Sequence, residues 1–135
     1  MTRTARSLAG TWHNERGSEL RLEVDPAGEL RGGFRPGDGA GAGETFPVAG
    51  FSSGNLVAFT VDFGKLGSLT SWVGHLIVDA GPQLEMLWQM TLEQPHPRRA
   101  EERWKTIWSG ADRFSHGAAP KDAARRQPLL PLWPL

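Results

Sequence analysis

The stretch QLEMLWQMTL, residues 83–92, decides the fold class, because its apolar side chains recur at every second position. Leu84, Met86, Trp88 and Met90 alternate with polar or charged residues, and Leu87 is the one break in the pattern. A period of two places the apolar side chains on one face of an extended chain. We therefore expect a half-buried β-strand over residues 83–92.

The same alternation recurs on both sides of this stretch, between turn sequences such as Asp25-Pro26-Ala27-Gly28 and Asp79-Ala80-Gly81-Pro82. Such turns favour hairpins between antiparallel neighbours. About eight strands are expected in total. They are Leu8–Asn14, Glu19–Val24, Glu29–Arg35, Glu44–Ser52, Leu56–Phe63, Leu69–Asp79, Gln83–Leu92 and Arg103–Phe114. Sequential antiparallel strands with short links predict an all-β fold, an eight-stranded antiparallel up-and-down β-barrel, because closure removes exposed sheet edges.

Composition limits the classes of partner. The chain has 135 residues, which suits one domain, and its 15 basic and 15 acidic residues cancel. A chain with no net charge gives no reason to expect a nucleic acid as its partner. It has no cysteine, which excludes disulfides and thiolate metal sites, and no apolar run long enough for a membrane helix. The first nine residues also lack the apolar run of a signal peptide, so we expect that one was removed or never existed.

Two segments are expected to lie outside the barrel wall. Residues 37–43 are rich in glycine and predict a flexible loop, without the Gly-Lys-Ser/Thr ending of a phosphate-binding loop. Residues 117–135 contain several prolines and end on apolar side chains, so they join a sheet or helix poorly. We therefore expect a barrel over residues 1–116, followed by a tail that is flexible or docked at a pocket mouth.

Polar residues begin or end otherwise apolar rows at two places. Asn14 and Ser18 follow the first row, and Ser68 and Thr70 open the row that contains Trp72. If these rows face the interior, the polar side chains meet at one mouth above an apolar floor, as in a small-molecule pocket. The alternative reading is that they merely terminate strands and that the tryptophans fill a core. No catalytic triad and no histidine spacing typical of a metal site is apparent.

Four motifs, in order, resemble those of the avidin and streptavidin family. The first, Gly10-Thr11-Trp12-His13-Asn14-Glu15-Arg16-Gly17-Ser18, is similar to the opening of these proteins. The others are Thr70-Ser71-Trp72-Val73-Gly74, then Met86-Leu87-Trp88-Gln89-Met90, and finally Trp104-Lys105-Thr106 with Gly110-Ala111-Asp112-Arg113-Phe114. The resemblance implies biotin as ligand, no cofactor or metal, no enzymatic activity, and a secreted or periplasmic protein.

The resemblance also assigns roles to residues. Asn14 and Ser18 would donate hydrogen bonds to the ureido oxygen of biotin, and Asp112 would accept one from a ureido N–H. Thr70 would face the thiophene sulfur and Ser68 the valeryl carboxylate. Trp104 would close the pocket of a neighbouring subunit, which implies a homotetramer. The full set of expected biotin-binding residues is Asn14, Ser18, Phe34, Phe63, Ser68, Thr70, Trp72, Trp88, Met90, Trp104 and Asp112.

Three departures from the family pattern lie in this pocket. Phe34 stands where the family has a tyrosine donor, Pro36 where it has a serine, and Phe63 where it has a tryptophan. Each lost partner of a buried polar group costs about 1–3 kcal/mol, so we expect binding weaker than that of the tightest members.

Two other functions remain open on the sequence alone. Gly10 and Trp12 also fit a lipocalin-like carrier of another hydrophobic ligand. A barrel that inhibits a partner protein through its apolar tail is the second alternative. In some relatives a C-terminal segment occupies a neighbour's biotin site, which gives this tail a third possible role.

Overall fold

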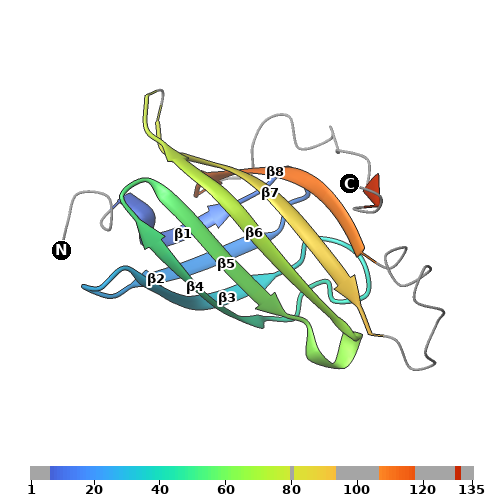
Figure 1. The fold of residues 1–135 in the computed structure, drawn as a ribbon. Coiled ribbons are helices and arrows are strands. Elements are labelled where there is room, and N and C mark those ends of the chain that lie inside the picture. Colours follow the sequence, from blue (N-terminus) through green and yellow to red (C-terminus); the bar gives the residue numbers. More distant parts are fainter. Residues whose placement is uncertain (1–6, 80, 94–106, 118–129, 132–135) are drawn as a thin grey trace.

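The computed structural model describes residues 7–79, 81–93, 107–117 and 130–131 of the chain. Figure 1 shows the strands wrapped in chain order around one barrel. The strands are β1 (Gly10–His13), β2 (Glu19–Val24), β3 (Glu29–Arg35), β4 (Phe46–Ser53), β5 (Leu56–Asp62), β6 (Ser68–Ile77), β7 (Gln83–Leu92), β8 (Ile107–His116) and β9 (Leu130–Pro131), with a short 3₁₀ helix, η1 (Gly64–Leu66), between β5 and β6.

Each of β1 to β8 pairs antiparallel with the next, and β8 returns to β1 through the pairs Trp12 with His116 and His13 with Ser115. This closure confirms the predicted all-β, eight-stranded up-and-down barrel. The His116 ring stacks on the Trp12 indole with 3.7 Å between ring centroids, which packs the seam on its inner side.

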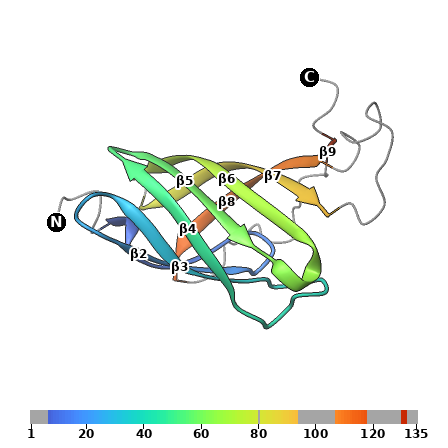
Figure 2. The ribbon, with the colours of Figure 1, turned by 60° about the horizontal axis from the view of Figure 1, so that its bottom comes forward.

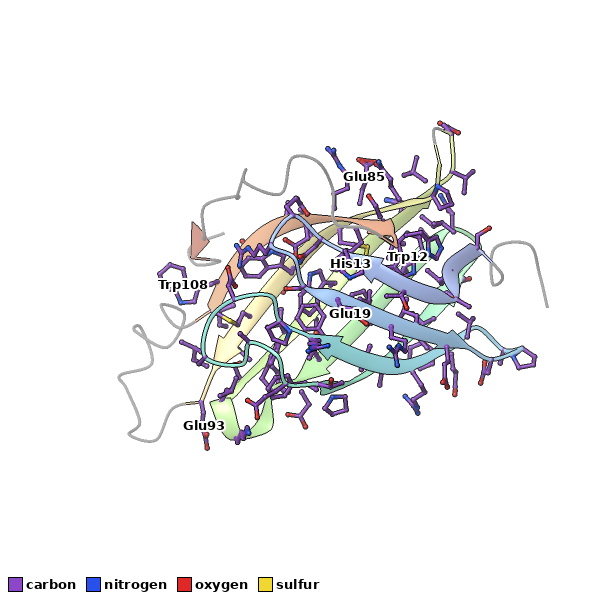
Figure 3. The ribbon with its side chains drawn as sticks, turned by 180° about the vertical axis from the view of Figure 1, so that it is seen from behind. Trp12, His13, Glu19, Glu85, Glu93 and Trp108 are labelled. Atoms are coloured by element: carbon purple, nitrogen blue, oxygen red, sulfur yellow. The ribbon has the colours of Figure 1, made fainter. Side chains whose placement is uncertain are left out.

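The strand rows fill the barrel interior as the alternation predicted. Leu84, Met86 and Trp88 of β7 are buried, and the same parity in β6 buries Trp72, which lies opposite Trp88 in the ladder. Leu87, the break in the pattern, is 64% exposed because it points outward. Figure 3 shows Glu85 of the same strand projecting away from the barrel.

The predicted strand bounds are wrong at β1. Leu8 lies in a helical turn before the strand, and Asn14 lies beyond its end. Both side chains are nevertheless buried. Trp12 Nε1 donates to the Leu8 carbonyl at 2.9 Å, which holds that turn against the barrel. The side-chain oxygen of Asn14 accepts backbone N–H groups of the following turn, which takes the place of ladder pairing.

Smaller corrections apply elsewhere. β4 begins at Phe46, after the glycine-rich loop, and β5 ends at Asp62, because Phe63 already precedes η1. β6 ends at Ile77, two residues before the predicted end. β8 runs two residues past its predicted end at Phe114, because Ser115 and His116 pair with β1. Residues 103–106 of the predicted last strand lie outside the described residues.

The tail was expected to join a sheet poorly, yet two of its residues pair with the barrel. Leu130 and Pro131 form β9 and pair antiparallel with Ser109 and Trp108 of β8, and Figure 2 shows β9 beside the end of β8. β9 is an edge strand of two residues, a position in which a missing proline N–H is tolerated. Among the described residues no helix is long and apolar enough to cross a membrane.

Candidate functional site

A pocket of about 230 Å³ opens at the end of the barrel where three connections meet. These are the β1–β2 turn, the β3–β4 loop and the β5–β6 link with η1; the latter two lie at the same end of the barrel in Figures 1 and 2. An ion pair between Lys65 of η1 and Glu44 of the β3–β4 loop joins two of them. Figure 3 shows Trp108 and Glu93 toward this open end and Trp12 toward the opposite, closed end.

The structure brings ten of the expected site residues together around this pocket. They are Asn14, Ser18, Phe34, Phe63, Ser68, Thr70, Trp72, Trp88, Met90 and Asp112. Trp104 lies outside the described residues. The sequence had left open whether the polar members merely terminate strands; their convergence on one cavity favours the pocket reading.

Asn14 is oriented by the turn that it begins. Its Oδ1 accepts the backbone N–H groups of Arg16 and Ser18, both at 3.0 Å. Its Nδ2 therefore faces the other way, and donates to Asp112 Oδ2 at 3.4 Å. An amide nitrogen carries two hydrogens, so a second donor remains for a ligand.

Ser18 is held by the loop that covers the pocket. Its hydroxyl oxygen accepts the backbone N–H of Gly37 at 3.0 Å. The residue is buried, and this contact uses the oxygen as acceptor and leaves the O–H as a donor. Asn14 and Ser18 thus present two donors on one wall.

Asp112 places a buried carboxyl group in the pocket, with only 8% of the residue exposed. Burial raises the pKa of its carboxyl, while the hydrogen bond from Trp72, the positive charge of Arg16 and the amide of Asn14 act to lower it. Trp72 Nε1 donates to Oδ2 at 2.8 Å. Trp88 also acts to lower the pKa, but its Nε1 makes no hydrogen bond within ordinary limits of distance and angle.

Aromatic rings form the apolar walls. Trp88 lies opposite Gly110 in the β7–β8 ladder, and a Cβ at Gly110 would stand 2.4 Å from the indole. The absence of a side chain there makes room for Trp88. Phe34 packs against Trp72 with 5.1 Å between centroids and meets Phe63 edge-on at 5.9 Å.

The remaining expected residues lie on the β6–β7 wall. Thr70 is buried and pairs with Met90 across the ladder, while Ser68 lies at the start of β6 and is partly exposed. Both hydroxyls share the inward parity of Trp72. Thr70 therefore lies deeper than Ser68 along the same row.

Five lining residues were not assigned to the site from the sequence: Arg16, Asp38, Ala40, Gly41 and Leu66. Pro36, which the sequence marked as a departure from the family pattern, also lines the pocket. The glycine-rich segment had been interpreted as a loop outside the wall. Gly41 is in fact buried, and a Cβ there would stand 2.9 Å from Leu66. Its lack of a side chain lets the loop fold over the mouth. For Arg16, the available signal was its position between Asn14 and Ser18.

No group of three or more His, Asp or Glu side chains in the described ranges is placed to hold a metal ion. The donors, the buried acceptor and the indole walls instead suit a small ligand that has both polar and apolar parts.

No curated protein matches the sequence of this chain. A low-affinity mutant of shwanavidin has 26% identity and a TM-score of 0.69, over 84% of this chain and 99% of that one. The bradavidin2–biotin complex has 27% identity and a TM-score of 0.66, over 81% and 96%. Xenavidin, at 24% identity and a TM-score of 0.71 over 82% and 97%, shares the fold. The model of the avidin family matches residues 2–117, and the chain therefore belongs to the avidin family.

Proposed function

We propose that this protein binds biotin without covalent chemistry, as a ligand-sequestering protein and not an enzyme, outside the cytoplasm. One observation carries the proposal. The buried polar or charged residues of the described chain are Asn14, Ser18, Thr70 and Asp112, and all four line the one pocket at the open end. Burying such groups without a partner is costly, so their convergence indicates a polar ligand.

The geometry complements a ureido group. Asn14 Nδ2 and the Ser18 hydroxyl supply two donors for its oxygen. Among the described contacts, both hydrogen bonds to Asp112 end on Oδ2, so Oδ1 remains to accept a ureido N–H. Polarisation of the ureido group toward a negative oxygen would strengthen all three bonds. Trp72 and Trp88 would then enclose the apolar rings of biotin.

The comparisons support this ligand. The bradavidin2 structure is a biotin complex. An apolar ligand of the lipocalin type would offer no N–H donor to Oδ1 of the buried Asp112 carboxylate, which disfavours that alternative.

We propose an affinity below that of the tightest family members. Phe34 lines the pocket with a ring that has no hydroxyl, and Pro36 lines it without a donor. The loss of one or two hydrogen bonds, at about 0.5–1.5 kcal/mol each, still permits useful binding.

Isothermal titration with biotin tests the proposal. We expect saturable heat with one site per chain, and weaker binding in Ser18→Ala. Ser71→Ala is the matched control, because Ser71 is exposed on the outer face of β6 and bonds only to Thr60 in the described contacts. Absence of heat, together with absence of displacement of a biotin dye, would contradict biotin binding.

We further propose that the protein is a homo-oligomer, and specifically a tetramer. An apolar band crosses the outer face of five adjacent strands, β4 to β8, at directly opposed ladder positions: Phe51, Ala58, Val73, Leu87 and Ala111. Phe51, Val73 and Leu87 are 66%, 60% and 64% exposed. A continuous exposed apolar band is typical of a protein interface. Trp104 would then reach the pocket of a neighbouring copy.

Light scattering checks the assembly. Leu87→Lys should lower the mass at micromolar concentration, because a charge in the band opposes its burial. Gln89→Lys, at the next outward position of β7, should leave the mass unchanged. A monomer mass for the unmodified protein would overturn the proposal.

A further inference from the structure

Among the residues that the structure describes, Arg16 is the one basic residue that lines the pocket. Its guanidinium carbon lies 5.7 Å from the centroid of the Trp88 ring, within the range of a cation–π interaction. Its backbone N–H donates to Asn14 Oδ1 at 3.0 Å, so the turn that orients Asn14 also places Arg16. The binding arrangement described above gives this residue no role.

Asp112 lines the same pocket, and a positive charge there favours its ionised form. Its carboxylate is buried, and of the described groups that favour its ionised form, Arg16 is the only one with a full charge. The others, Trp72, Asn14 and Trp88, are neutral dipoles. A ligand that fills the pocket would remove more water from the carboxylate and increase the cost of its charge.

Resting on the biotin function proposed above, we infer that Arg16 is a positioning residue that acts through Asp112. From the face of Trp88 it supplies the charge that keeps the carboxylate ionised as an acceptor for the ligand N–H. An aromatic face suits this task, because it holds a guanidinium near the acid without a hydrogen bond that would occupy the acceptor oxygen.

Three other charged residues lie near Asp112. Asp38 lines the same pocket from the β3–β4 loop. Glu15 and Arg113 lie on the outer side of the barrel, where Glu15 Oε1 accepts the backbone N–H of Arg113. The inward residues of β6 and β7 next to the acid, such as Trp72 and Trp88, carry no charge. Among these described groups, Arg16 is therefore the one that brings a positive charge into the pocket.

The test compares Arg16→Met, which keeps the length and loses the charge, with Arg16→Lys, which keeps the charge. The carboxyl ¹³C signal of Asp112 is titrated by NMR in the ligand-free protein. We expect its midpoint to rise in Arg16→Met, since the loss of a nearby opposite charge disfavours the ionised carboxylate. Arg16→Lys should stay near the unmodified protein. Arg21→Met is the control, because Arg21 lies on the outer face of β2 with a side chain 69% exposed.

Biotin affinity is then measured across the same pH range. The acid limit of binding should move upward with the Asp112 midpoint in Arg16→Met and should not move in Arg21→Met. An unchanged Asp112 midpoint in Arg16→Met would overturn the inference. If the unmodified protein binds no biotin at pH 8, the proposed function fails, while the NMR titration still decides the role of Arg16.

Discussion

The closed and open ends of the barrel interior are built from the same strands, yet they differ in how polar atoms are buried. At the closed end Trp12 is 0% exposed, and its N–H donates to a backbone carbonyl of the same chain. At the open end four buried polar side chains converge, and Trp88 Nε1 is buried without a hydrogen bond. A closed end that is complete by itself favours stability. An open end with unused donors and acceptors favours a ligand.

The largest effect should come from the closed end. Leu84 is fully buried there and pairs with Phe114 across the ladder. Leu84→Ala should lower the free energy of unfolding by about 2–5 kcal/mol through lost burial and a cavity. Urea denaturation of the ligand-free protein measures it. Leu56→Ala, at an outward and exposed position of β5, should change it by about 0.5 kcal/mol or less. Equal losses in the two variants would remove the distinction between core and surface.

The next effect should come from the open end and appear in binding. Asp112→Asn removes the charged acceptor, so biotin affinity should fall about 10- to 150-fold, which corresponds to about 1.5–3 kcal/mol. Calorimetry measures this loss, with Glu85→Gln on the outer face of β7 as the control. A loss of stability as large as that of Leu84→Ala would contradict the assignment of Asp112 to binding.

The pH dependence should differ in sign for stability and binding. Burial raises the folded pKa of Asp112 above its ordinary value of 3.8. At a pH between the unfolded and the folded pKa of Asp112, the folded state holds more protons than the unfolded state. The contribution of this group to the free energy of unfolding therefore falls as the pH rises between the two pKa values. Biotin affinity should increase over the same pH range as the carboxylate ionises. The melting temperatures of the unmodified protein and of Asp112→Asn, compared across pH, should isolate the effect of this carboxyl on stability. If the melting temperatures of the two proteins changed in parallel with pH, the predicted contribution of Asp112 to stability would be refuted.

The smallest effect is a gain. Phe34→Tyr places a hydroxyl in the pocket wall, and one added hydrogen bond should raise biotin affinity by about 0.5–1.5 kcal/mol. Leu69→Tyr, at an exposed outward position of β6 outside the apolar band, should have no effect on biotin affinity. Unchanged or weaker binding in Phe34→Tyr would show that the hydroxyl does not reach the ligand.

The sequence predicted the barrel wall well, because a period of two directly reports which side chains face inward. Seven of the ten expected residues that line the pocket lie in the motifs that resemble the family. The other three, Phe34, Phe63 and Ser68, followed from the wider family pattern. Arg16 and the mouth loop did not follow, because their positions depend on tertiary contacts, such as Gly37 with Ser18. The early end of β1 depends on a side-chain hydrogen bond of Asn14, and β9 on an edge of β8. No local pattern encodes either of these.

The most direct test uses the indole N–H signals of the tryptophans in a ¹H–¹⁵N NMR spectrum, assigned by Trp→Phe substitution, with and without biotin. Trp72 and Trp88 belong to the open end and Trp12 to the closed end. We predict that saturating biotin shifts the Trp72 and Trp88 signals and leaves the Trp12 signal in place. A shift of Trp12 alone, or no shift of Trp72 and Trp88, would contradict the account.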